Sequence, residues 1–71
     1  MKFEEFERKL REMGYGIAAM NHYSLGGKNY TYCVVLGKNE KAFQAEGESS
    51  EKVFEMIINK IVKHRESTKL N

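Results

Sequence analysis

The sequence lacks proline and tryptophan altogether, and Cys33 is the only cysteine among its 71 residues. One cysteine cannot form a disulfide within the chain, which is typical of a reducing compartment, so we expect a cytoplasmic protein. No apolar run approaches the ~20 residues that cross a bilayer, so we expect no membrane partner. Residues 1–10 are amphipathic and contain three glutamates, whereas a secretory signal begins basic and continues apolar.

The sequence also lacks a strong excess of charge of either sign. Its 12 basic and 10 acidic residues give a formal net charge of +2. This is far below the positive field of a dedicated nucleic-acid-binding protein, so charge neither requires nor excludes an anionic partner. The length suits one domain with a small core, whose net stability is typically ~3–5 kcal/mol. A large enclosed active site is therefore not expected.

The sequence has no residue pattern typical of catalysis or metal binding. His22 and His64 fall in different segments, and Cys33 sits among aliphatic residues, which favours a buried structural thiol over a nucleophile. No Cys/His spacing resembles a metal site, and no glycine-rich phosphate loop precedes a helix. We therefore predict a non-enzymatic protein with no catalytic residue, no metal and no cofactor.

The most informative segment is Ser49–His64, where large apolar residues recur at steps of three and four and so share one helix face. These residues are Val53, Phe54, Ile57, Ile58 and Ile61. Met56 and Val62 widen the face at its edges. Because this arc is wider than one neighbouring layer covers, we expect the helix to lie on a sheet and to touch a second helix.

The other segments alternate between helical and strand patterns. Residues 2–13 predict a helix, because acids precede bases at i,i+4 and an apolar stripe repeats at steps of three and four. Strands are predicted over residues 15–24, 29–36 and 41–46, from alternation and β-branched or aromatic content. Small residues at 18–20 give the first strand a weak propensity, so we expect a local departure there.

This order of elements predicts an α+β fold, α-β-β-β-α. Each predicted helix has one apolar face, so both can pack on the same face of a three-stranded antiparallel sheet and leave its other face to solvent. We assign residues 1–65 to this single domain. The polar residues 66–71 are expected to form a disordered tail.

Three motifs carry a resemblance to a known family. They are a glycine-rich loop at Gly26–Asn29, a strand end at Val34–Gly37, and the junction Gly47–Val53 before the last helix. With the element order, these residues resemble the double-stranded RNA-binding domain. The resemblance implies phosphate contacts from the start of the last helix and minor-groove contacts from the loop. Ser50 and Glu51 stand where the family has its first two lysines.

The resemblance makes RNA binding our first functional hypothesis. A small non-catalytic module would engage structured or double-stranded RNA through its glycine-rich loop, its turn lysines and the start of the last helix. The residues expected to do so are Gly26, Gly27, Lys28, Asn29, Lys38, Lys41 and Lys52. Carboxylates beside Lys52 would oppose this binding, because they repel phosphates.

A protein-interaction module is the alternative hypothesis, either as a homodimer or as an accessory or inhibitor protein of a mobile element that docks on a larger complex. Tyr30, Tyr32 and Met56 are its candidate contact residues. The tyrosines could form an aromatic platform on the open sheet face, or could pair across strands at the edge of the core. The family's strand pattern favours the second arrangement, with Tyr30 and Tyr32 on the face that the helices cover.

Overall fold

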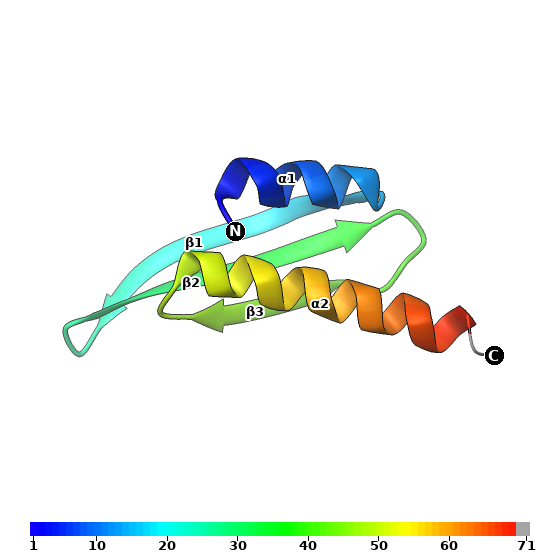
Figure 1. Ribbon diagram of the computed structural model, residues 1–71. Helices are drawn as coiled ribbons and strands as arrows, with labels where there is room; N and C mark the ends of the chain where they lie inside the picture. Colours follow the sequence, from blue (N-terminus) through cyan, green and yellow to red (C-terminus); the bar gives the residue numbers. More distant parts are fainter. Residues whose placement is uncertain (70–71) are drawn as a thin grey trace.

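The computed structural model describes the backbone of residues 1–69 and the side chains of residues 1–67. Its elements follow the predicted order α-β-β-β-α, which confirms the α+β class (Figure 1). Their bounds are α1 Phe3–Glu12, β1 Tyr15–Leu25, β2 Lys28–Gly37, β3 Phe43–Gly47 and α2 Ser50–Lys69. No helix in the described part of the chain is both long and apolar enough to cross a membrane.

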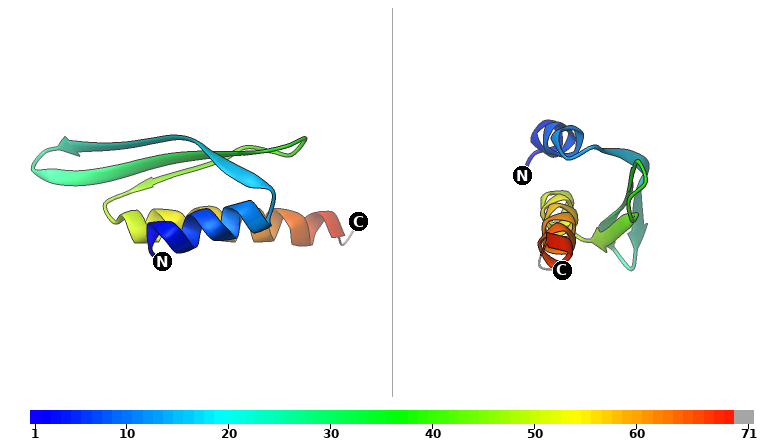
Figure 2. Two further views of the ribbon diagram at one scale, coloured as in Figure 1. Left: turned by 90° about the horizontal axis from the view of Figure 1, so that it is seen from above. Right: turned by 90° about the vertical axis from the view of Figure 1, so that its right-hand side faces the viewer.

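The three strands form one antiparallel sheet in the order β1-β2-β3, so β2 is the central strand. Both helices lie on the same side of this sheet (Figure 2). Helix α2 contacts β2 and β3, whereas α1 contacts β1 and α2. The predicted architecture, with two helices on one face and the other face open, is therefore confirmed.

The register of β2 differs from the expected one. Thr31, Cys33 and Val35 are 0–3% exposed and face the helices. The alternate row, which begins with Tyr30 and Tyr32, faces away from them. The predicted burial of these tyrosines is wrong. Both rows of β2 are apolar, so alternation alone does not choose between them. The small inward row fits under α2, while the outward register leaves the phenol hydroxyl groups accessible to polar partners.

Strand β1 has an irregular start and a tight end. Its register with β2 shifts between Ile17 and Ala19, so Ala18 is the extra residue of a β-bulge, within the predicted departure at 18–20. At the other end Leu25 pairs with Lys28 across a two-residue turn. Both turn residues, Gly26 and Gly27, have positive φ angles of 60° and 79°, which a type I′ turn requires.

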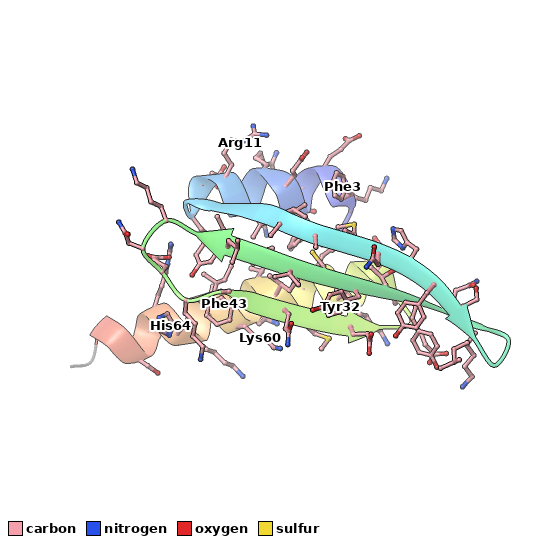
Figure 3. All side chains as sticks on the ribbon, turned by 180° about the vertical axis from the view of Figure 1, so that it is seen from behind. Phe3, Arg11, Tyr32, Phe43, Lys60 and His64 are labelled. Carbon is pink, nitrogen blue, oxygen red and sulfur yellow. The ribbon has the colours of Figure 1, made fainter. Side chains whose placement is uncertain are left out.

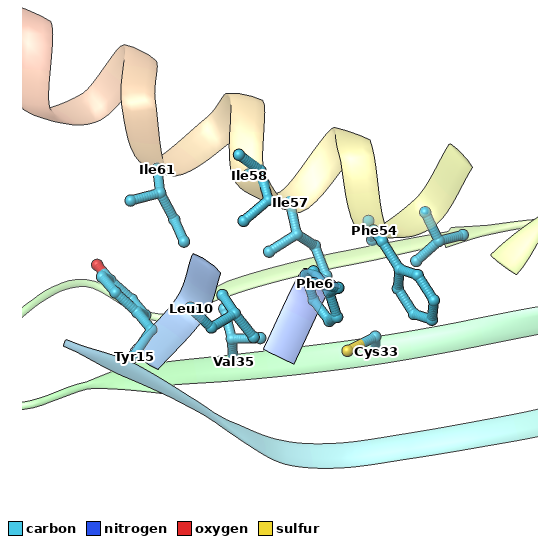
Figure 4. Close-up of a cluster of buried hydrophobic side chains, with 11 residues drawn as sticks. Phe6, Leu10, Tyr15, Cys33, Val35, Phe54, Ile57, Ile58 and Ile61 are labelled. Carbon is cyan, nitrogen blue, oxygen red and sulfur yellow. The ribbon is translucent and has the colours of Figure 1, made fainter. Parts of the chain in front are cut away.

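The core forms where the apolar face of α2 meets the sheet and α1 (Figure 4). All five predicted face residues are at most 8% exposed; they are Val53, Phe54, Ile57, Ile58 and Ile61. The ring of Phe54 stacks on Phe6 of α1, with centroids 4.4 Å apart and planes at 12°. This stack is the contact between helices that the width of the apolar arc predicts. Ser49 precedes α2, and its Oγ accepts a hydrogen bond from the Lys52 backbone nitrogen.

Helix α2 continues beyond the predicted domain end at residue 65, into the segment expected to be a tail, and residues 70–71 lie outside the described residues. Arg65 contributes to this extension. Its guanidinium group donates a hydrogen bond to the Met13 carbonyl and lies 3.2 Å from Oε2 of Glu40. One side chain thus joins α2 to the end of α1 and to the turn between β2 and β3.

We expect the substitution Ile57→Val to lower the free energy of unfolding by about 1 kcal/mol, because Ile57 is fully buried and a lost methylene leaves a small cavity. Urea unfolding followed by circular dichroism measures this. The neighbouring Met56→Gln is the control, because Met56 is 42% exposed and its substitution should cost less than about 0.5 kcal/mol. Equal effects would contradict the assigned helix face.

The contact between Arg65 and Glu40 predicts a pH effect on stability. The hydrogen bond from Arg65, and secondarily that from Tyr15, holds the pKa of Glu40 below its ordinary value of 4.5. A carboxyl group whose pKa is lowered on folding stabilises the protein above its unfolded pKa, and this stabilisation is lost as the pH falls through its folded pKa.

We therefore expect Glu40→Gln to lower the melting temperature at pH 7, and the difference from the wild type to shrink below about pH 4.5. Thermal unfolding at pH 7, 5, 4 and 3 measures this. Glu7→Gln, at an exposed position of α1, serves as a control whose difference from the wild type should change little with pH. A Glu40→Gln difference that persists unchanged at pH 3 would contradict the role given to this carboxylate.

Candidate functional site

The side of the sheet away from the helices carries a row of large apolar residues. We call it the open face and define it by Tyr23, Leu25, Tyr30, Tyr32, Val34 and Leu36. Leu25 is 69% exposed, Leu36 is 53% exposed and Tyr23 is 38% exposed. Solvated faces of antiparallel sheets are usually polar, so this row on the central strand departs from the rule.

Hydrogen bonds and stacking hold the tyrosines of the open face in place. The rings of Tyr23 and Tyr30 stack with centroids 5.3 Å apart. The Tyr23 hydroxyl donates to Oε2 of Glu46 at 2.5 Å, and the Tyr32 hydroxyl donates to Oε1 of Gln44 at 2.7 Å. The bond to Glu46 raises the pKa of Tyr23 to about 12, because the carboxylate accepts from the neutral phenol and disfavours its ionised form. Figure 3 views this face, with Tyr32 near its centre.

The residues predicted to bind RNA fall at two opposite ends of the sheet. At the hairpin end, Lys28 lies 3.8 Å from a carboxylate oxygen of Glu48, and Asn29 accepts a hydrogen bond from Ser24 at 2.6 Å. Lys52, in the first turn of α2, has Glu51 and Glu55 as neighbours. Gly26 and Gly27 form the turn itself. Acidic residues therefore accompany the predicted phosphate contacts at this end.

Lys38 and Lys41 follow β2, in the connection to β3 at the other end of the sheet. Here a groove of about 530 Å³ runs between β3 and α2. Its walls are Val34, Lys41, Ala42, Phe43, Gln44, Lys60 and Lys63, so three lysines and no carboxylate line it. Sequence reasoning missed this groove. The i,i+3 spacing of Lys60 and Lys63 beside the apolar face of α2 was its available signal.

A hydrogen-bonded series of polar side chains connects β1, β2 and the start of α2. Nδ1 of His22 lies 3.0 Å from the Thr31 hydroxyl, which lies 2.6 Å from the Ser50 hydroxyl. These residues line a small polar pocket of about 240 Å³. Thr31 is only 3% exposed, so these hydrogen bonds satisfy a buried hydroxyl group and do not present it to a substrate.

The remaining candidate residues lie apart from one another. Cys33 is fully buried on the inward row of β2, as predicted, and burial raises the pKa of its thiol. A raised pKa keeps the thiol protonated, which disfavours a nucleophilic role. Met56 is exposed on α2, whereas Tyr30 and Tyr32 lie on the open face of β2. The three predicted protein-contact residues therefore do not form one surface.

In the described residues, no group of three or more His, Cys, Asp and Glu side chains is placed to hold a metal ion. Comparison of the chain with protein-family models, curated proteins and solved structures found no match. The likeness to the double-stranded RNA-binding domain thus remains a prediction, and what the chain does must be argued from its surfaces.

Proposed function

We propose that this chain is a non-catalytic protein-interaction module and that the open face is its recognition surface. The observation that carries the proposal is the continuous apolar row of β2, which runs from Tyr30 to Leu36 on the side that no helix covers. Exposed apolar patches bordered by polar residues are typical of protein-binding sites, and tyrosine is enriched among residues that dominate binding energy.

The composition of the open face favours a protein partner over a nucleic acid. Glu46 lies beside the stacked pair of Tyr23 and Tyr30, and its carboxylate would repel a phosphate that approached these rings. A protein surface can meet the same group with a lysine or arginine. We therefore expect a partner that presents aliphatic side chains to β2 and a basic side chain to Glu46.

The ordered side chains also lower the cost of binding. Tyr23, Tyr30 and Tyr32 are each held by a stacking contact or a hydrogen bond before any partner arrives. Side chains that are already fixed lose little conformational entropy on association. We therefore expect the tyrosines to contribute more to affinity than Leu25, which is 69% exposed.

To test this, a photoreactive benzoylphenylalanine is placed at position 32 and, as a control, at position 56 on α2. We expect a protein to be cross-linked from position 32 only. With that partner purified, Tyr32→Ala should weaken binding roughly tenfold or more, because tyrosine is enriched among the few interface residues whose truncation costs about 2 kcal/mol or more.

Met56→Gln is the matched control and should bind the partner like the wild type. Calorimetry measures both affinities, and circular dichroism confirms that the variants are folded. A cross-linked partner whose affinity Tyr32→Ala leaves unchanged would overturn the proposal, as would cross-linking that depends on position 56 alone.

A second candidate, RNA binding, keeps one specific observation in its favour, the lysine-lined groove between β3 and α2. Lys41 and Lys63 line this groove without a carboxylate partner on its walls, and Lys38 precedes it in the chain. Lysines placed along a groove can follow a phosphate backbone, and their binding weakens as salt rises. This contact surface differs from the one that the family resemblance implies.

Fluorescence anisotropy with duplex and single-stranded RNA at low and moderate salt tests this candidate. We expect Lys41→Glu with Lys63→Glu to weaken binding at least tenfold, and Lys28→Gln with Lys52→Gln to have little effect. The reverse result would favour the family-like surface at the hairpin end. Absence of binding by the wild type at micromolar concentration in low salt would remove RNA as a ligand.

A further inference from the structure

The two edges of the sheet differ in how they are protected. The edge of β3 is five residues long, and Lys60 of α2 donates a hydrogen bond to the Gln44 carbonyl at 2.7 Å. A short edge strand and a lysine placed against its outward carbonyl both hinder pairing with another chain. The edge of β1 is longer, at 11 residues, and its sequence YGIAAMNHYSL has neither a charged residue nor a proline.

Hairpin geometry identifies which backbone groups of β1 point outward. The pair next to a two-residue turn is hydrogen-bonded, so Leu25 faces β2 and every second residue before it does the same. The outward residues are then Ser24, His22 and Met20. The same alternation carried across β2 makes Gln44 an outward residue of β3, which agrees with its bond to Lys60.

The outward groups of β1 have no partner among the described residues. No turn, loop or side-chain hydrogen bond reaches the backbone of Met20, His22 or Ser24. The helices also leave the inner side of this edge open, because a groove of about 460 Å³ lies between Met20 and Phe3 at the start of α1. The edge therefore offers three N–H groups and three C=O groups to an added strand.

We propose that β1 pairs antiparallel with β1 of a second copy of this chain, with a two-fold axis at His22. In this register His22 lies opposite itself and Met20 lies opposite Ser24 of the second copy, so that each pair exchanges two hydrogen bonds. Strand self-pairing brings identical residues together, and β1 contains no charge that would repel its own copy. This absence of charge favours a second copy as the occupant of the edge.

The strand pairing itself is independent of the proposed function. Its benefit rests on that function, because the dimer would bring two recognition surfaces together. A two-fold axis perpendicular to the sheet joins the strands in the order β3-β2-β1-β1-β2-β3 and keeps the helices of both copies on one side. Both open faces then lie on the other side, next to one another. The recognition surface would thus be doubled, and a partner could engage both rows of tyrosines at once.

Sedimentation velocity tests the pairing. The concentrations run from about 10 µM to about 1 mM, because a short ladder buries less than the ~1,200 Å² of a stable complex and should associate weakly. We expect the wild type to associate with rising concentration. His22→Lys and His22→Glu should each weaken association at least tenfold, because each places like charges opposite one another at the axis. An equimolar mixture of the two variants should recover a dimer, which neither forms alone.

Recovery of a dimer in the mixture would show that both His22 variants are folded, so the weaker association of each variant alone could not be attributed to misfolding. Gln44→Lys and Gln44→Glu, on the edge of β3, are matched controls and should associate like the wild type. Tyr32→Ala should also leave the dimer intact, so loss of partner binding and loss of pairing can be told apart. A wild type that stays monomeric at 1 mM would overturn the proposal, as would unaltered association of both His22 variants or a mixture that does not recover a dimer.

Discussion

The structure depends on which row of β2 packs against α2. In a strand the two rows are fixed to opposite faces, so the choice cannot be made residue by residue. With Cys33 and Val35 inward, the aromatic row is left on the outside in its entirety. The strands still supply Tyr15 and Phe43 to the core and its edge, while the helices supply Phe6 and Phe54, which stack on one another. The apolar open face is thus a direct result of the register in which β2 packs against α2.

The sequence predicts the architecture well because its strongest signals are local and periodic. Apolar residues that recur at steps of three and four define one inward face for each helix, and the acid-before-base order in α1 supports its helical structure. The rows of β2 have no such asymmetry, since each carries apolar residues, Val34 and Leu36 in one and Cys33 and Val35 in the other. The choice of the inward row depends on the space beneath α2 and on the hydrogen bond between Thr31 and Ser50. Both involve residues that are distant in sequence. The candidate site was therefore less predictable than the fold.

Charge is distributed unevenly along α2. Glu51 and Glu55 occupy the start of the helix, where they also face the N-terminal amino group, whereas Lys60, Lys63 and Arg65 occupy its second half. Acids at the start and bases at the end are what the helix dipole favours. Lys52 and Glu66 are the exceptions, so the first half of α2 is mostly acidic and its second half mostly basic, which the small net charge of the chain does not show.

The hairpin of β1 and β2 extends beyond the end of β3. Strand β3 reaches only as far as the pair of Thr31 and Gly47, so the segment from Tyr23 to Tyr30 is a two-stranded ribbon that projects past the third strand and the helices (Figure 2). Side-chain contacts tie this ribbon to the rest of the domain, among them the hydrogen bond from Tyr23 to Glu46 of β3 and the ion pair of Lys28 with Glu48. The turn of the ribbon, Gly26 and Gly27, lies beyond the core residues and is therefore a position at which a grafted loop or an inserted tag should be tolerated.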